Sequence, residues 1–266
     1  MSTENVLDHH RGDRPDTPAR ARLMATKVPE VTVCFWVIKV LTTGMGETAS
    51  DFLAKALDPV LAVGLGGLGL AASLLLQFAV RRYVAWIYWT GIVMVSVFGT
   101  MAADVLHVVL GVPYALSTPF FMIVLAAVFA LWHLREGTLS IHSIHTRRRE
   151  LFYWAAVLAT FALGTAAGDL TASVGLRYLG SAALFAVAIC VPALLHRSGL
   201  LGAVTAFWSA YVVTRPLGAS LADWMALPGS RGGLGMGLGP VTLSWTVAIV
   251  GFVACLAVSK RDTQAG

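Results

Sequence analysis

The sequence contains little charge. Only 12% of its 266 residues are Asp, Glu, Lys or Arg, roughly half of what a soluble domain of this size carries. In contrast, 57% of the residues are hydrophobic, and the mean hydropathy is +0.76. The apolar residues come in runs of about 20, the length that crosses hydrocarbon as a helix. The composition therefore excludes an ordinary soluble domain and predicts an all-α, polytopic membrane protein.

Cysteine is also scarce, and several catalytic patterns are missing. Cys34, Cys190 and Cys255 lie in apolar segments without paired spacing, which argues against a disulfide framework or a CxxC metal site. We expect them to be small, buried apolar residues. No nucleophile–base pair, HExxH motif or phosphate-binding loop appears, so we expect no enzymatic activity and no cofactor other than a possible bound divalent cation.

The first 27 residues are polar and contain no apolar segment of the kind found in a cleavable secretory signal. We expect residues 1–27 to be a disordered cytoplasmic tail, with 260–266 as a second, shorter tail. The net charge of +5 is better explained by membrane topology than by binding to nucleic acid. The sequence therefore predicts the lipid bilayer as a partner and no nucleic acid, and it leaves protein partners and a homo-oligomer open.

Eight membrane spans are predicted, separated by Pro- and Gly-containing connections. Their approximate ranges are 31–56, 60–80, 85–110, 117–134, 151–174, 178–196, 201–226 and 240–258. The longest connection, 137–150, contains His142 and His145 and three arginines. The two histidines are more typical of a solvated loop than of a metal site, and the arginines are expected to meet anionic lipid headgroups.

Basic residues are distributed unequally between the two sides of these spans. One side carries the N-terminal arginines and the basic residues of three connections and the C-terminus, namely Arg81, Arg82, Arg135, Arg147, Arg148, Arg149, Arg197, Lys260 and Arg261. The other side carries Arg177 and Arg231. The positive-inside rule therefore places both termini in the cytoplasm.

A repeated motif organises the chain. Four segments align without gaps: "WVIKVLTTGMGETASD", "WTGIVMVSVFGTMAAD", "WAAVLATFALGTAAGD" and "WSAYVVTRPLGASLAD". In each, Gly follows Trp by ten residues and Asp follows Gly by five. The triples are Trp36/Gly46/Asp51, Trp89/Gly99/Asp104, Trp154/Gly164/Asp169 and Trp208/Gly218/Asp223. An aromatic residue precedes every Trp.

The motif predicts four parallel two-helix repeats, with the motif on the first helix of each. We assign repeat 1 to 28–83, repeat 2 to 84–136, repeat 3 to 151–198 and repeat 4 to 199–259. With its Trp–Gly–Asp spacing, the chain resembles bacterial integral-membrane proteins built from four tandem copies of a "repeat of unknown function". The segments "KVPEVTVCFWVIKVLTTGMGETASDFL" and "IHSIHTRRRELFYWAAVLATFALGTAAGDL" carry the resemblance. The resemblance implies the same eight-helix architecture and a location in the inner membrane of a bacterium.

Every aspartate that lies within a predicted span is one of the four motif aspartates. A charged group at mid-membrane costs ~3 kcal/mol on insertion scales, so these carboxyls need a partner, a proton, water or a bound cation. One interpretation is that each Asp locks its helix to a neighbour. The other is that the four first helices converge and Asp51, Asp104, Asp169 and Asp223 surround a cation-binding cavity.

Repeat 1 differs from the others in carrying Glu47, one turn before Asp51 on the same helix face. These two carboxyls could hold one ion together, and hard divalent cations such as Mn²⁺ or Mg²⁺, or protons, suit such ligands. His107 follows Asp104 by three residues. It could be a ligand, a proton acceptor or, the preferred reading for a single His, the hydrogen-bond partner of Asp104.

Two basic residues lie inside predicted spans. Lys39 and Arg215 could neutralise carboxylates, and Arg215 lies roughly on the helix face of Asp223. Pro216 frees a backbone carbonyl, so the seventh span is a candidate for a kink and a moving part.

The Trp and Gly positions suggest packing roles. The four tryptophans fit an interfacial aromatic belt, or alternatively packing between repeats around a central axis. The four glycines predict close approach of helices. Two functions remain open: a secondary transporter or channel for a small cation, either a divalent metal or a proton, and a non-transporting membrane scaffold or regulator.

Overall fold

The structure, a computed structural model, describes residues 26–259, and in this range it consists of helices and connections without a strand. The α-helices are α2 (Val33–Ala56), α3 (Pro59–Ala79), α4 (Ala85–Asp104), α5 (Tyr114–Glu136), α6 (Arg147–Thr171), α7 (Arg177–Ala188), α8 (Cys190–Arg197), α9 (Ala203–Ala226) and α10 (Leu238–Ser259). Short π segments, η1 (Val105–Val109) and η3 (Ala172–Leu176), extend α4 and α6, and η2 (Ile141–Ser143) and η4 (Gly229–Arg231) are 3-10 turns. Helices thus lie in each of the eight ranges predicted as spans, and the expectation of an all-α protein is confirmed. The expected tails, 1–27 and 260–266, lie almost wholly outside the described residues.

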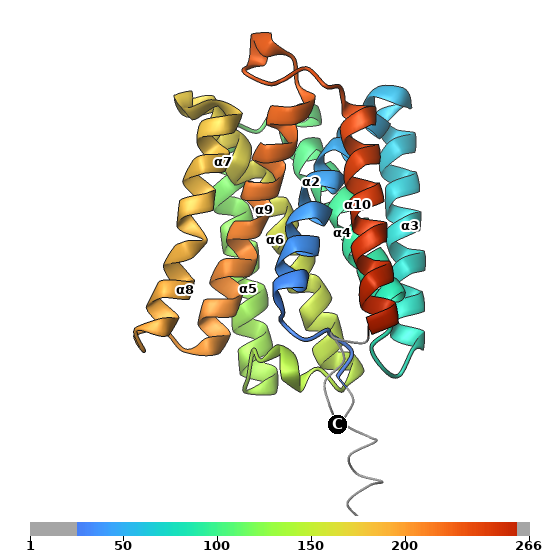
Figure 1. The fold of residues 1–266 in the computed structure, drawn as a ribbon, viewed down its shortest axis with the longest axis vertical. Coiled ribbons are helices and arrows are strands. Elements are labelled where there is room, and N and C mark those ends of the chain that lie inside the picture. The colour runs from blue at the N-terminus through green and yellow to red at the C-terminus, as the bar shows by residue number, and fades with distance from the viewer. Residues whose placement is uncertain (1–25, 260–266) are drawn as a thin grey trace, which may run out of the picture.

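Local sequence signals explain where several helices begin and reverse. Thr32 accepts a hydrogen bond from the Phe35 backbone N–H at 3.2 Å, and Asp58 caps α3 in the same way, which satisfies backbone donors that the first turn leaves free. The chain reverses between α6 and α7 (Figure 1), and Gly175, inside η3, has a φ of +108°. A side chain at that φ would be strained, and Gly removes the strain.

Five stretches of the described chain are helical, long and apolar enough to cross a membrane. They are Pro59–Ala79, Ala85–Val109, Tyr114–Glu136, Arg147–Arg197 and Leu238–Ser259. The fourth joins α6, α7 and α8 through η3 and contains the reversal between α6 and α7 (Figure 1). By helix length and hydropathy, the chain is a multi-pass membrane protein.

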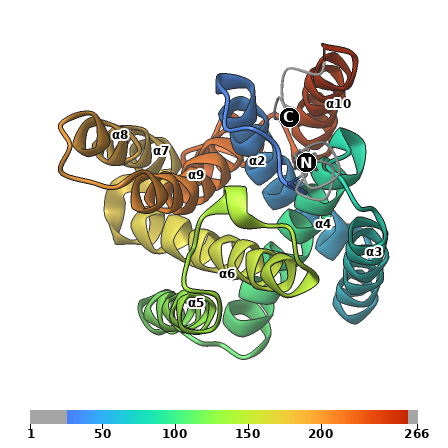
Figure 2. The ribbon, with the colours of Figure 1, turned by 90° about the horizontal axis from the view of Figure 1, so that it is seen from below.

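The helices form two concentric groups, seen end-on in Figure 2. The motif-bearing helices α2, α4, α6 and α9 are the inner helices, and each packs against the next, with α9 returning to α2. The outer helices are α3, α5, α7 with α8, and α10. Each outer helix packs mainly on the inner helix of the following repeat: α3 on α4, α5 on α6, α7 on α9, and α10 on α2. The four repeats therefore form a closed ring with pseudo-fourfold symmetry.

The motif glycines allow the inner helices to approach closely. At each of the four positions, a Cβ would overlap the residue that lies seven positions after the motif Trp in the next repeat, here called the +7 residue. The pairs are Gly46 with Ser96, Gly99 with Phe161, Gly164 with Arg215, and Gly218 with Thr43. This small-residue contact is typical of membrane helices, where close packing replaces a hydrophobic driving force.

The motif aromatics form a second closed set of contacts near the opposite end of the inner helices. The aromatic residue before each Trp contacts the Trp of the next repeat, with ring centroids about 6 Å apart. The pairs are Phe35 with Trp89 at 5.7 Å, Tyr88 with Trp154 at 5.8 Å, Tyr153 with Trp208 at 6.1 Å, and Phe207 with Trp36 at 5.7 Å. Trp89, Trp154 and Trp208 are buried, so they lie between repeats rather than in a belt facing lipid.

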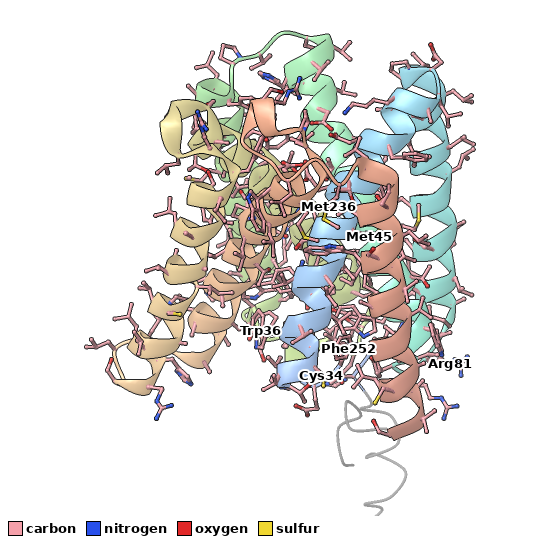
Figure 3. All side chains as sticks on the ribbon, turned by 45° about the horizontal axis from the view of Figure 1, so that its top comes forward. Cys34, Trp36, Met45, Arg81, Met236 and Phe252 are labelled. Atoms are coloured by element: carbon pink, nitrogen blue, oxygen red, sulfur yellow. The ribbon has the colours of Figure 1, made fainter. Side chains whose placement is uncertain are left out.

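Two sequence expectations need correction. Cys34, Cys190 and Cys255 are exposed on the outside of the bundle, not buried; Figure 3 shows Cys34 and Trp36 near the start of α2 and Arg81 toward the same end of the molecule. Cys190 and Cys255 lie on the outer helices α8 and α10, and Cys34 lies in the first turn of α2; a small apolar side chain fits lipid as well as a core. Basic residues at the other end also include Lys55, near the end of α2, in addition to Arg177 and Arg231.

A valine at Gly218 tests the packing of the inner helices. Its side chain would collide with Thr43 and with the Val40 carbonyl oxygen, and overpacking of this kind costs ~1–3 kcal/mol. We expect Gly218→Val to lower the midpoint of thermal unfolding in detergent by several degrees. Gly251→Val on α10 is the matched control, because a Cβ there meets nothing within 4 Å. Equal midpoints for the two variants would contradict the close approach.

Candidate functional site

A cavity of about 490 Å³ lies where the inner helices end, at the opposite end from the aromatic contacts. All four motif aspartates and Glu47 line it. Each aspartate comes from a different inner helix, since the motif has the same register in every repeat. The structure therefore brings together five carboxyls that are far apart in sequence, around one cavity, as the sequence proposed for converging helices.

The aspartates differ in how much of each is accessible. Asp51, Asp104 and Asp169 are partly buried, whereas Asp223 is only 6% exposed. Among the described residues, Asp104 and Asp223 have no hydrogen bond or ion pair, Asp51 faces Lys55 at 3.9 Å, and the Tyr114 hydroxyl lies beside the Asp169 carboxyl. All four carboxyls thus line the cavity, and Asp169 also has Tyr114 of the neighbouring α5 beside it.

The floor of the cavity is a buried polar cluster around Glu47. Its Oε2 accepts hydrogen bonds from Arg215 Nη2 at 3.0 Å, Thr100 Oγ1 at 3.2 Å and Thr165 Oγ1 at 3.1 Å. Glu47, Thr100 and Thr165 occupy the same repeat position, one turn before the motif Asp. At that position repeat 4 has Ala219, which is buried and leaves room for the arginine.

Arg215 is fully buried and reaches across the inner helices. Besides Glu47, it donates from Nη1 to the Thr43 carbonyl oxygen at 2.6 Å and from Nη2 to Thr165 Oγ1 at 2.8 Å and to Thr100. Arg215 thus neutralises Glu47, and it makes no ion pair with Asp223, the carboxyl on its own helix. α9 continues from Ala203 to Ala226 as one helix through Pro216.

Lys39 lies deeper still and has no carboxylate partner. Its Nζ is 4.0 Å from the ring centroid of Phe161 and 4.1 Å from that of Tyr211, and it makes no hydrogen bond. A desolvated ammonium over aromatic faces gains cation–π attraction of ~2 kcal/mol or more. Arg215, Lys39, Phe161 and Tyr211, all fully buried, close the floor of the cavity.

The mouth of the cavity carries opposite charge. Lys55 and Arg231, both exposed, line it together with Tyr114 and Tyr178. The π segment η1 begins directly after Asp104 and supplies part of the wall.

The structure places the other two candidate ligands, His107 and Glu47, differently. His107 does not line the cavity; its Nδ1 is 2.8 Å from the Val112 carbonyl oxygen, and its ring stacks on Tyr114 at 3.5 Å. Glu47 and Asp51 both line the cavity, but Glu47 Oε2 is already bonded to three donors. Within residues 26–259, no three His, Cys, Asp or Glu side chains lie close enough together to hold a metal ion.

Sequence reasoning missed part of the site. Thr100 and Thr165 directly follow the motif Gly, as Glu47 does, but their role as donors to Glu47 was not foreseen. Ser50 stands directly before the motif Asp, where the other repeats have Ala103, Gly168 and Ala222. Tyr114, Tyr178 and Arg231 lie outside the motif segments, so nothing in the sequence placed them at the cavity.

The Glu47–Arg215 pair gives a stability prediction. Removing one member of a buried ion pair costs ~3–5 kcal/mol because the other charge loses its partner, whereas replacing both by apolar residues is often neutral. We expect Arg215→Met to lower the thermal midpoint strongly, and the double variant Glu47→Met/Arg215→Met to recover much of the loss. Additive losses in the double variant would show that the pair is not energetically coupled.

The sequence itself matches a known family over most of its length. The family described as Repeat of Unknown Function (DUF347) matches residues 34–83, 87–138, 152–198 and 206–262, and each match contains one inner and one outer helix. Searches of curated proteins and of solved structures found no match. Because the four matches cover more than half of the chain, the protein belongs to the DUF347 family and contains four tandem copies of its repeat.

Proposed function

We propose that the protein is a cation transporter that crosses a bacterial inner membrane eight times and has no enzymatic activity. Both termini are cytoplasmic in this proposal, because the arginine-rich connections lie at the end from which α2 starts. The carboxylate cavity then opens toward the outside of the cell.

The observation that carries the proposal is the set of five carboxyls around one cavity. A charged side chain inside the membrane costs free energy unless it is paired with another group or faces a water-filled cavity. Only Glu47 has a strong internal partner, and Asp104 and Asp223 have neither a hydrogen bond nor an ion pair within the described chain. A cation supplied from outside would offset their cost.

The closed floor supports a carrier rather than an open channel. Below Glu47 the path is filled by Arg215, Lys39 and aromatic rings, all fully buried. A cation near Glu47 would compete with Arg215 for the same carboxylate. Release of Arg215, which holds Thr43 of α2 as well as Glu47, would loosen the contact between α2 and α9 and offers a route to an inward-open state.

The same closed floor also favours the second candidate, a non-transporting scaffold or regulator. In that function the cavity would be a recess on one face, and its aspartates would bind a ligand or stabilise the fold without passage of ions. Both candidate functions allow a ligand to bind in the cavity, but only the transporter moves a cation across the membrane.

Flux measurements in proteoliposomes separate them. We expect accumulation of a cation by the native protein, and a loss of at least tenfold in Asp104→Asn and Asp223→Asn, because each removes an unpaired carboxyl from the cavity. Asp58→Asn is the matched control: Asp58 caps α3 outside the cavity, and Asn caps a helix equally well. Absence of flux for every cation tested, with folded native protein, would leave the scaffold.

The topology can be tested by cysteine labelling. In a variant without Cys34, Cys190 and Cys255, Ser230→Cys at the cavity end is expected to react with a membrane-impermeant maleimide on intact cells. Ser143→Cys in the central connection is expected to react only after the cells are opened. The reverse labelling pattern would invert the proposed orientation.

A further inference from the structure

We propose that the ligand of the cavity is a short alkyl diamine, that is, an organic cation with two separated ammonium groups, rather than a bare metal ion or a proton. This inference rests on the proposed function for transport but concerns the binding site itself. Four properties of the cavity support it: its size, the spacing of its acids, its unpaired acceptors and its apolar wall.

The cavity is far larger than an inorganic ion requires. Its volume of about 490 Å³ is in the range of small-molecule sites, roughly 300–1,000 Å³, and would hold about 16 waters at ~30 Å³ each. A divalent ion is instead coordinated by oxygen atoms at ~2.0–2.6 Å, so the side chains that bind it must lie close to one another. A cavity of this size leaves a bare ion without contacts on most sides.

The acids are spread around the wall. Each motif Asp comes from a different inner helix, and no three acidic, His or Cys side chains of the described chain approach closely enough to share one ion. Separate carboxyls suit separate positive groups. A diamine with ammonium groups at its two ends can meet carboxyls on different helices at once.

The acceptors that a diamine needs are free. Asp223 is only 6% exposed and lines the cavity without a hydrogen bond or ion pair in the described chain. Ser50, fully buried, also lines it, and its Oγ has no partner. An ammonium group brings three donors and no acceptor, so it complements carboxylate and hydroxyl oxygens.

One side of the cavity is apolar and fits the alkyl chain. This side is formed by α3, α4 and η1, through Ala62, Val63, Met101, Val105 and Val108. Methylene groups between two ammonium ends would contact these side chains. Tyr114 and Tyr178 stand at the cavity margin, where an aromatic ring and hydroxyl can receive a cation.

The test measures binding of 1,4-diaminobutane to the full-length protein in lipid nanodiscs. We expect saturable binding, at least tenfold weaker binding of 1-aminobutane, and no competition from equimolar Mn²⁺, Mg²⁺ or Ca²⁺. Asp104→Asn and Asp223→Asn are expected to weaken diamine binding at least tenfold, with Asp58→Asn unchanged. If Asp223→Asn does not fold, Asp51→Asn at the partly exposed edge takes its place.

The same protein in proteoliposomes separates the two proposals. Diamine binding without flux would support this inference and overturn transport. Flux of Mn²⁺, Mg²⁺ or protons without diamine binding would support transport and overturn this inference. Equal binding of 1-aminobutane would also overturn it, because a single ammonium would then suffice, and absence of both binding and flux would overturn both.

Discussion

The close approach of four inner helices is the constraint on which the rest of this structure depends. A glycine in each repeat contacts the +7 residue of the next, and the last repeat closes onto the first. In a membrane, where lipid is as apolar as a helix face, such contacts supply much of the association. They also bring side chains from four helices within hydrogen-bond distance, so both the polar cluster and the cavity depend on them.

The site arises where the symmetry of the ring is broken. The packing of one inner helix on the next repeats four times, but the side chains do not. At the position directly after the motif Gly, repeat 1 has Glu47, repeats 2 and 3 have threonine, and repeat 4 has Ala219. The +7 position likewise has one arginine among Thr43, Ser96 and Phe161. These two substitutions meet as the Glu47–Arg215 pair. A buried pair is a weak source of stability when compared with apolar residues of similar volume, and this one lies directly below the cavity.

The inner bundle is also polarised along its length. Aromatic rings and Lys39 fill one end of the inner bundle, whereas the other end contains the cavity and the carboxyls that line it. Because the interior screens charge much less than water does, the aspartates and the buried Arg215 act on any charge in the cavity more strongly than they would in water. One end of the ring therefore carries the cavity, and the other end is closed.

The sequence by itself determined the helices, the four repeats and the residues that share a register. The length of the apolar runs and the Trp–Gly–Asp spacing are local properties of the chain. They predicted a helix in each of the eight ranges, and they predicted that the motif glycines allow helices to approach closely, though not which helices. The tertiary structure alone decided which carboxyl Arg215 neutralises, that His107 turns to a backbone carbonyl, and that Tyr114 and Arg231 reach the cavity. These outcomes depend on which helices become neighbours when the ring closes, and the residues involved differ from one repeat to the next, so the repeat pattern does not predict them.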